Sequence, residues 1–399
     1  MNKTKIIKEG KFTILLLTFS FILYNCTFLN YMHAFGQQQQ QSPSSSPQQV
    51  LNIDLIQNQT IQSQNNNSNT NGFLKMESRE LHNIFKNVEN SVVYVQVHLG
   101  NNYSSSGSGF VYGDSNKGYI ITNNHVVNGS VSGKADVTFS DGNAYTAKII
   151  GTDSYDDLAV LQIVDDFSEE HPVPLILTNS SKLEVGQTVI AIGNPGIAGF
   201  LTLSNTMTMG IVSQLGRVFP TTIEGFPETD LIQTDTIINH GNSGGPLLDT
   251  DGHIVGITTF GAINSTGLNF AIPSNLVLRI VPAIIQNGHY DHPWLGFYGD
   301  TLNPVIAENL LGLPRNTKGV VLFSVATGGP LDKAGLNRGD IITATDGIPV
   351  RTIGDLLSYL EEHKSIRDNI GLTVNRNGQV MNLNATVQTR PSLSTSSTR

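Results

Sequence analysis

Cysteine and charged side chains are both scarce in this sequence. Only one of the 399 residues is cysteine, Cys26, so neither an intrachain disulfide nor a cysteine-based zinc site can form. Charged residues make up 14% of the chain, against roughly 25% in an average globular protein. This shortage favours β structure and loops over long charged helices. Hydrophobic residues reach 39%, which is enough for a packed core and excludes global disorder.

Positive charge is also in short supply. The chain has 23 Lys and Arg against 32 Asp and Glu, a net charge of −9, which would repel a phosphate backbone. We therefore expect no nucleic-acid partner. No glycine-rich loop with Lys and Ser/Thr is present to cradle phosphates, so we expect no nucleotide and no other cofactor. His289 and His292 flank Asp291 and could hold a metal, but we expect an exposed linker there and no metal site.

The N-terminus has the residue order of an export signal. Lys3, Lys5, Lys8 and Lys11 precede an apolar run from Phe12 to Tyr24, and this order predicts export. Two outcomes stay open for residues 1–36. Small residues at Ala34 and Gly36 suit cleavage of a signal peptide, whereas an apolar stretch extended to Phe35 approaches the ~20 residues of a retained membrane anchor.

Two segments outside the N-terminal signal are expected to be disordered. Residues 37–72 are rich in Gln, Asn and Ser, and too few apolar side chains are present there to offset the entropy of ordering. Residues 389–399 have the composition of a solvated tail. The folded part should therefore lie between about residues 73 and 388.

Short β-branched runs separated by Gly, Asn or Asp dominate residues 73–288. Many short strands at close spacing predict a barrel or a sandwich. A helix is expected over 73–88 and another over 273–285, with Gly288 just past its end. A second unit, residues 289–388, mixes strands with helical stretches at 304–311 and 353–363. The expected strands are 91–97, 109–112, 119–122, 135–139, 158–163, 187–192, 207–212, 253–259 and 268–272.

The segment Gly241-Asn242-Ser243-Gly244-Gly245-Pro246 is the most informative motif. A serine hydroxyl needs a base to become a nucleophile, and the oxyanion that it creates needs preorganised donors. Flanking glycines allow a tight turn that aims backbone amides inward. Alone, such a string could be an ordinary turn.

Two other motifs change that assessment. His125 ends the apolar strand before Val126, and Asp157 directly precedes Leu158-Ala159-Val160. The chain order His, Asp, Ser is that of the chymotrypsin arrangement, and differs from the orders in subtilisins and α/β-hydrolases. Each residue alone could be structural, but the coincidence of three favours acyl-transfer chemistry.

These motifs resemble those of the HtrA (Deg) family of trypsin-like serine proteases with a C-terminal PDZ domain. The resemblance implies a mainly β fold: a chymotrypsin/trypsin-like double β-barrel over 73–288, then a smaller α+β PDZ domain over 289–388. It assigns the catalytic triad to His125, Asp157 and Ser243. Asp157 is preferred over Asp153 and Asp156 because the family aspartate directly precedes the Leu-Ala-Val strand.

The resemblance also assigns the groups around the nucleophile. Gly241 and Ser243, with Asn242 between them, would form the oxyanion hole. Asn242 cannot pair with a newly cleaved N-terminus as the aspartate of digestive relatives does, so we expect control by ordering of the loops 193–205 and 215–229 instead. Leu215-Gly216-Arg217 resembles the family's sensing loop. His240 could add pH dependence, although an exposed position without a role is the alternative.

Substrate choice is expected to involve Ile238, Asn269 and Phe270, which match the lining of the family's primary specificity pocket. An aliphatic lining disfavours charged side chains, so Val, Ala, Ile or Leu is expected before the scissile bond. A role for Ile238 in the core is an equal alternative.

The second unit contains two PDZ-like strings. Leu295, Gly296 and Phe297 resemble the loop that receives a peptide carboxylate, and the stretch from Lys333 to Asp346-Gly347 resembles the domain's central turn. Such domains bind an extended C-terminus as an added strand. Leu295 and Phe297 could instead be core side chains.

The sequence therefore predicts an exported serine endopeptidase of unfolded or damaged proteins, extracytoplasmic and secreted or anchored to the membrane. The PDZ domain would bind C-termini or regulate activity, and the resemblance implies a trimer. A PDZ-bearing holdase with little or no proteolysis is the alternative, and a dedicated signalling protease is a third.

Overall fold

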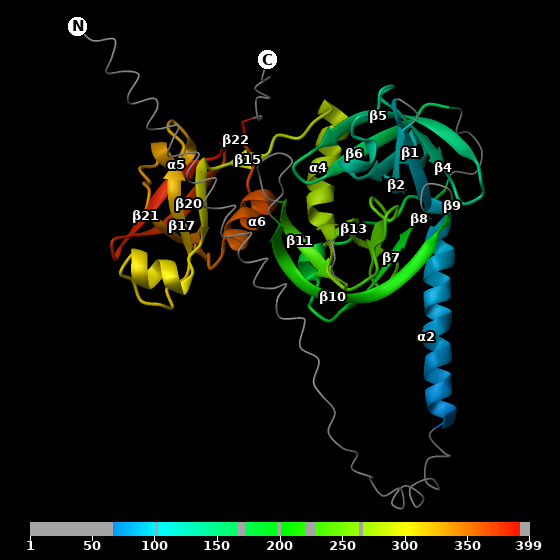
Figure 1. Ribbon diagram of the computed structural model, residues 1–399, viewed down its shortest axis with the longest axis horizontal. Helices are drawn as coiled ribbons and strands as arrows, with labels where there is room; N and C mark the ends of the chain where they lie inside the picture. Colours follow the sequence, from blue (N-terminus) through cyan, green and yellow to red (C-terminus); the bar gives the residue numbers. More distant parts are fainter. Residues whose placement is uncertain are drawn as a thin grey trace, which may run out of the picture. The chain divides into compact units, whose positions relative to one another are not determined.

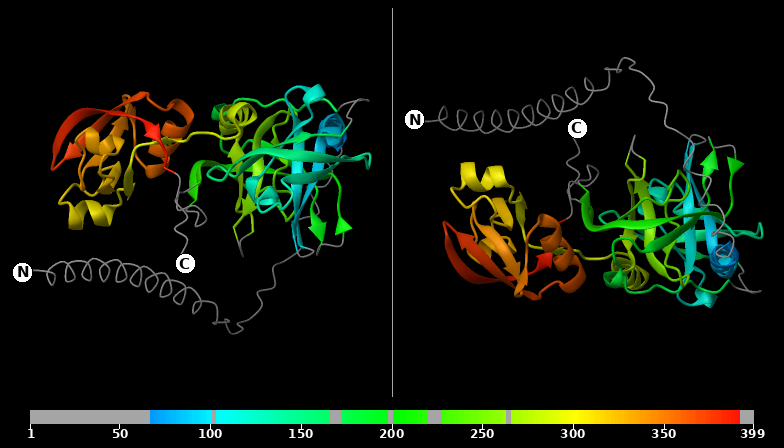
Figure 2. Two further views of the ribbon diagram at one scale, coloured as in Figure 1. Left: turned by 90° about the horizontal axis from the view of Figure 1, so that it is seen from above. Right: turned by 90° about the horizontal axis from the view of Figure 1, so that it is seen from below.

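The computed structural model describes residues 67–100, 103–165, 172–197, 201–219, 228–262 and 266–391. The predicted signal or anchor, residues 37–66 of the predicted linker and residues 392–399 of the predicted tail lie outside these ranges. Within them, no helix combines the length and the apolar character that a membrane crossing requires. Strands dominate, and the predicted mainly β fold is confirmed (Figures 1 and 2).

The first barrel is closed by six antiparallel strands in the order β1-β2-β3-β6-β5-β4. Strand β1 alternates inward and outward, so that Val93, Val95 and Val97 are fully buried while their neighbours are less so. This alternation of period two directs one face of the strand into the barrel core. The strands are β1 Val92–Gly100, β2 Tyr103–Tyr112, β3 Tyr119–Thr122, β4 Lys134–Thr138, β5 Ala144–Asp153 and β6 Leu158–Ile163.

The second barrel repeats the architecture with the order β10-β11-β14-β13-β12-β7. Its strands are β7 Thr188–Gly193, β10 Thr206–Phe219, β11 Glu228–Thr234, β12 Pro246–Leu248, β13 Ile254–Gly261 and β14 Asn269–Pro273. A short ladder joins β8 (Gly196–Ile197) to β9 (Leu201–Thr202). One apolar cluster contains side chains of both barrels, such as Leu158 and Ile254. The two barrels are therefore packed against a common core.

Two helices add to that common core. Helix α4 (Ser274–Asn287) buries one face completely, including Val277 and Ile284, against both barrels. It ends as predicted at Gly288, whose φ of 82° is left-handed and whose N–H donates to Ile284 O over 2.8 Å. Glycine favours this conformation because it has no Cβ. Helix α2 (Asn67–Val88) begins six residues before the predicted start and packs Ile84 and Val88 against the same cluster.

The second unit is a β sheet with one long helix. The sheet order is β16-β17-β18-β20-β21, with β16 at its edge. Helix α6 (Ile353–His363) matches the predicted bounds because Thr352 and Asp355 form a capping box at its start. The strands are β16 Phe297–Thr301, β17 Val320–Val325, β18 Ile341–Thr345, β19 Ile348–Pro349, β20 Asn369–Arg376 and β21 Gln379–Thr386.

Several predicted boundaries differ from the structure. Strand β10 continues to Phe219, so Leu215, Gly216 and Arg217 are strand residues rather than part of a loop. The helix predicted over 304–311 is reduced to a π-helical turn, Ile306–Leu310, next to two residues of helix. Thr389, expected in the free tail, pairs with Pro293 in the small sheet of β15 (Pro293–Trp294) and β22 (Gln388–Thr389).

Candidate active site

His125 and Asp157 are brought together by two short connections of the first barrel. His125 lies on α3 (Asn124–Val127), which directly follows β3, and Asp157 precedes β6. His125 Nδ1 lies 2.6 Å from Asp157 Oδ2, and the His125 backbone N–H donates to Asp157 Oδ1 over 2.8 Å. A second link runs from Asn124 N to Asp157 O, 3.1 Å long. The carboxylate therefore fixes both the ring and the backbone of His125.

The pair shifts the protonation of the imidazole. Burial alone would lower the pKa of His125, but the hydrogen bond to Asp157 and its negative charge outweigh burial, and the pKa is raised above the ordinary 6.5. Asp157 itself is buried and has a φ of 51°, a left-handed backbone for a residue other than glycine. Such a conformation persists only where the surrounding structure fixes it.

Thr259 is a member of this site that the sequence analysis missed. Its hydroxyl donates to Asp157 Oδ2 over 2.8 Å, and its carbonyl oxygen accepts the Ser243 hydroxyl at 2.7 Å. Thr259 belongs to β13 of the second barrel and is buried. The available signal in the sequence was the pair Thr258-Thr259, which ends the predicted apolar strand 253–259. Thr259 therefore links the acid of one barrel to the hydroxyl of the other.

The turn that carries Ser243 is held against the first barrel. Ser108, fully buried on β2, donates its hydroxyl to Gly241 O over 2.6 Å, and its backbone N–H donates to Ser243 O over 2.8 Å. Gly107 separates Val126 from Ser243 so closely that an added Cβ would lie 2.6 Å from Val126 Cγ2 and 2.8 Å from Ser243 O. The segment of His125 and the segment of Ser243 therefore flank one glycine.

Ser243 is oriented toward Thr259 in this structure. Among the hydrogen bonds of the described residues, its Oγ donates to Thr259 O and has no bond to His125. The structure thus joins His125 to Asp157 directly and places Ser243 beside them through Thr259.

The backbone around Ser243 has the geometry that its glycines allow. Gly241 and Gly244 have φ values of 100° and 85°. Within the described part of the chain, the N–H groups of Gly241 and Ser243 have no backbone acceptor, whereas the Asn242 N–H donates to Asn239 O over 2.9 Å. The Asn242 side chain is buried, and its Oδ1 has no partner among the described polar atoms. His240 is exposed.

The three residues expected at the specificity pocket have different surroundings. Ile238 is half-buried beyond the end of β11. Asn269 donates from Nδ2 to Thr236 O over 2.9 Å. Phe270 packs into the shared core, with its ring centroid 5.1 Å from that of Phe260.

The PDZ-like loop is built partly from core residues. Leu295 is buried in the core of the second unit, and its carbonyl oxygen accepts Leu331 N–H at 3.0 Å. Gly296 has a φ of 79°. Phe297 starts the edge strand β16, opposite Val325 of β17.

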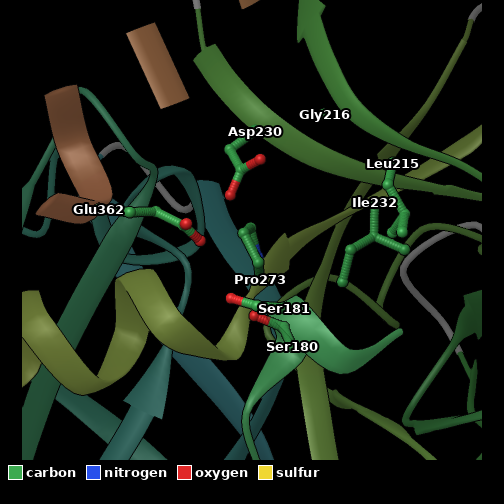
Figure 3. A pocket seen from close by; sticks show the side chains of 8 residues that line it. All are labelled: Ser180, Ser181, Leu215, Gly216, Asp230, Ile232, Pro273 and Glu362. Atoms are coloured by element: carbon green, nitrogen blue, oxygen red, sulfur yellow. The ribbon is translucent and has the colours of Figure 1, made fainter. Parts of the chain in front are cut away.

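The described residues also contain other groupings of polar side chains. Asp249, Asp251 and His253 form one group that could hold a metal, but Asp249 Oδ1 already accepts the backbone N–H groups of Asp251 and His253 within a turn. A second such group, Asp153, Asp156 and His292, is buried. The expected exposed linker is therefore wrong for His292, which is 2% exposed. A cavity of about 130 Å³ is lined by Ser180, Ser181, Leu215, Gly216, Asp230, Ile232, Pro273 and Glu362 (Figure 3).

Comparison with known proteins places this arrangement in a family. Residues 107–257 match the trypsin-like peptidase domain, and residues 308–387 match the PDZ domain. The serine protease Do-like HtrA of Lactococcus lactis subsp. cremoris (strain MG1363) is 38% identical over 73% of this chain and 72% of its own length. This chain belongs to the HtrA family of trypsin-like serine proteases.

Other HtrA proteins extend the similarity. The serine protease Do-like HtrA of Bacillus subtilis (strain 168) is 43% identical over 70% of this chain, which spans 62% of that relative's length. A solved structure of the HtrA-type protease AlgW with a tripeptide is 34% identical, with a TM-score of 0.63, covering 78% of this chain and 98% of its own. The double barrel and the PDZ domain are thus those of HtrA proteins.

The glycine-rich turn of this HtrA chain generates a first prediction. A Cβ at Gly244 would lie 2.2 Å from Ser108 O and 2.4 Å from Thr122 Oγ1, at a φ of 85°. Those two atoms are themselves hydrogen-bonded over 2.6 Å, so neither can move freely. Gly244→Ala should reduce the free energy of unfolding by about 2 to 4 kcal/mol, measured by urea denaturation.

Gly142→Ala is the matched control. Gly142 has a φ of 88°, but an added Cβ would meet nothing within 4 Å. Gly142→Ala should lose stability only through the strain of a left-handed backbone at a residue with a Cβ. Equal losses in the two variants would show that the close approach at Gly244 is without effect.

Proposed function

We propose that this chain is an exported serine endopeptidase that cleaves unfolded or damaged proteins. The observation that carries the proposal is the His125–Asp157 pair, 2.6 Å apart, beside a serine whose turn is anchored to the same barrel. HtrA family membership and the order of basic and apolar residues at the N-terminus support it.

In this proposal Ser243 is the nucleophile and His125 the general base. His125 accepts the Ser243 proton during attack on the scissile carbonyl and returns it to the leaving amine. Asp157 holds the imidazole in the tautomer that carries its proton on Nδ1, and stabilises the charged ring. The N–H groups of Gly241 and Ser243, with Asn242 between them, receive the oxyanion.

The Ser243 hydroxyl must turn from Thr259 O toward His125 before it can react. We infer that the structure corresponds to a resting arrangement of the nucleophile. Ordering of the segments 193–205 and 215–229 would then control activity; residues 198–200 and 220–227 of these segments lie outside the described ranges.

The remaining assignments belong to the same proposal. Ile238, Asn269 and Phe270 would set a preference for aliphatic side chains before the scissile bond. The PDZ domain would receive a substrate C-terminus at Leu295, Gly296 and Phe297. Strand β16 suits this function because it lies at the sheet edge, where a peptide can add as a further strand. Assembly as a trimer is also proposed.

The pH dependence of hydrolysis follows from the His125–Asp157 pair. Only the neutral imidazole can act as base, and the pKa of His125 is raised above 6.5 by Asp157 despite burial. kcat/KM should therefore fall as the pH drops through a value above 6.5. Asp157→Asn should lower kcat by about 10⁴-fold and move the residual acid limb to lower pH, because the charge that favours the imidazolium is removed.

Asp136→Asn is the matched control for this experiment. Asp136 also faces a histidine, with His98 Nε2 3.5 Å from Asp136 Oδ2, but both side chains are more than half exposed. The pH profile of kcat/KM in Asp136→Asn should equal that of the unmodified chain. An acid limb that does not move in Asp157→Asn would contradict the assignment of Asp157.

The function itself is tested with casein as an unfolded substrate and a fluorophosphonate as a probe of activated serine. The unmodified chain should produce fragments and take up the label, and Ser243→Ala should do neither. Exposed Ser140 provides the control variant, Ser140→Ala, which should match the unmodified chain. Suppressed aggregation of casein with no serine-dependent fragments would instead support the holdase.

A further inference from the structure

His292 is a buried histidine outside the proposed triad. It lies in the segment that joins α4 to β15 and is 2% exposed. Its Nε2 is 2.9 and 3.0 Å from the two carboxylate oxygens of Asp153, and its Nδ1 is 3.3 and 3.4 Å from those of Glu361. Since a carboxylate only accepts, both ring nitrogens must donate. The ring is thus held as an imidazolium that bridges two acids.

The bridge joins different parts of the fold. Asp153 ends β5 of the first barrel, and Glu361 lies in the last turn of α6 in the PDZ unit. Arg390, just after β22, donates to Glu361 Oε1 over 2.6 Å, and its guanidinium lies 4.9 Å from the centroid of the Tyr155 ring. Tyr155 and Tyr290 each contact the His292 ring edge-on, with centroids 4.8 Å apart.

The charges of this cluster balance only if one acid keeps its proton. Asp153, Asp156 and Glu361 provide three carboxyl groups against the two cations His292 and Arg390. Burial raises the pKa of Asp156 to about 8, with the charge of His292 opposing this rise and those of Glu361 and Asp153 adding to it. A neutral Asp156 leaves the cluster without net charge at pH 7.

Two acids of β11 also have raised pKa values. Burial raises the pKa of Glu228 to about 8, and the charge of Asp157 adds to this rise. Burial and Glu362 raise the pKa of Asp230 to about 8. Figure 3 shows the carboxyl groups of Asp230 and Glu362 directed into one cavity, beside Ser180 and Ser181. The end of α6 therefore lies beside buried acids of the protease domain whose pKa values are raised, such as Asp230.

The acidic last turn of helix α6 is stabilised by the two cations of the cluster. Its last turn contains Glu361 and Glu362, and acidic side chains at a helix C-terminus oppose the helix dipole. The imidazolium of His292 and the guanidinium of Arg390 both face Glu361. A cation beside this end of the helix is favourable for both the dipole and the carboxylate.

The cluster is connected by one short turn to Asp157. Residues 153–157 join β5 to β6, and Asp153 Oδ1 closes the turn by accepting the Tyr155 backbone N–H over 3.0 Å. The same carboxylate is held from the other side by His292. Asp157 ends this turn in its left-handed conformation, with its carbonyl oxygen accepting Asn123 Nδ2 at 2.9 Å. Asp153, the residue that His292 holds, is therefore only four peptide units from Asp157.

We propose that His292 is a positioning residue for the acid of the triad, and that it fixes the turn 153–157 by bridging Asp153 to Glu361. The inference rests on the proposed function because it takes Asp157 as the acid. His292 does not touch substrate; it acts by limiting where Asp157 can lie. Small displacements at a reacting centre are costly, since about 1 Å can lower a rate by about 10²-fold.

The test uses the full chain with His292→Gln and an unstructured peptide substrate. Glutamine is neutral and cannot donate to two acids on opposite sides. We expect kcat to fall by about 10- to 100-fold with KM nearly unchanged, and the acid limb of kcat to move to lower pH because a looser Asp157 raises the pKa of His125 less. His289→Gln is the control, since the His289 side chain is 65% exposed in the same segment; it should behave as the unmodified chain.

Further variants separate positioning from folding. If His292→Gln does not fold, Glu361→Gln weakens the same bridge from the α6 side and should give the same loss of kcat and the same shift. The double variant His292→Gln/Asp153→Asn should lose no more than the worse single variant, because both act through one contact. A lowered melting temperature with kcat and acid limb intact would overturn the proposal.

Two further measurements keep the outcomes distinct. The unmodified chain and Ser243→Ala, assayed together, report whether the proposed function holds at all, independently of His292. NMR of histidine-labelled protein should show His292 protonated on both nitrogens at pH 8, whether or not the chain is active. A neutral ring, or a stoichiometric divalent cation that is lost in His292→Gln, would overturn the imidazolium bridge.

The proton on Asp156 gives an independent prediction. The folded-state pKa of about 8 lies above the ordinary 3.8. The stability that this group provides is therefore fully present below pH 3.8, declines as the pH rises from 3.8, and is lost once the pH has passed 8. Asparagine has no proton to lose. Asp156→Asn should therefore gain stability over the unmodified chain as the pH rises from 4 to 8, measured by urea unfolding at a series of pH values.

Asp291→Asn serves as the control for Asp156→Asn. The Asp291 side chain is 57% exposed in the segment beside His292, and its effect should stay within about 0.5 kcal/mol at every pH. An advantage of Asp156→Asn that is constant with pH, or that shrinks as the pH rises, would contradict the buried proton.

Discussion

The Asp157 carboxylate is the point on which the candidate site depends. Its two oxygens accept the backbone N–H and Nδ1–H of His125 from the first barrel and the Thr259 hydroxyl from the second. The oxygens of a buried carboxylate need hydrogen-bond donors, and here the donors come from both barrels. These hydrogen bonds persist only while the barrels keep their spacing, and that spacing sets the position of the imidazole.

That spacing is maintained by a shared core rather than by a flexible connection. Side chains of both barrels and of α4 belong to one apolar cluster. Closely packed interiors resist small displacements, so the groups at the barrel interface are held to positions that chemistry requires. Ser108 adds a polar link, because it bonds to Gly241 and Ser243 from the opposite barrel.

The parts of this site that the sequence predicted are those with local signals. His125, Asp157 and Ser243 stand in short motifs whose neighbours specify a strand end or a glycine turn, and helix α6 is delimited by its own capping box. Thr259 and Ser108 were missed because their roles depend on partners 102 and 133 residues away. Strand β5 was missed because several of its side chains are half-buried or exposed, which weakens the alternation, and β12 has only three residues.

His292 was misjudged for the same reason. The local pattern around Asp291 is polar and suggests a linker, but its burial is determined by Asp153 and Glu361, 139 and 69 residues away. A chain with few basic residues cannot pair every buried acid with Lys or Arg. At the end of α6 it uses one imidazole, one guanidinium and retained protons instead.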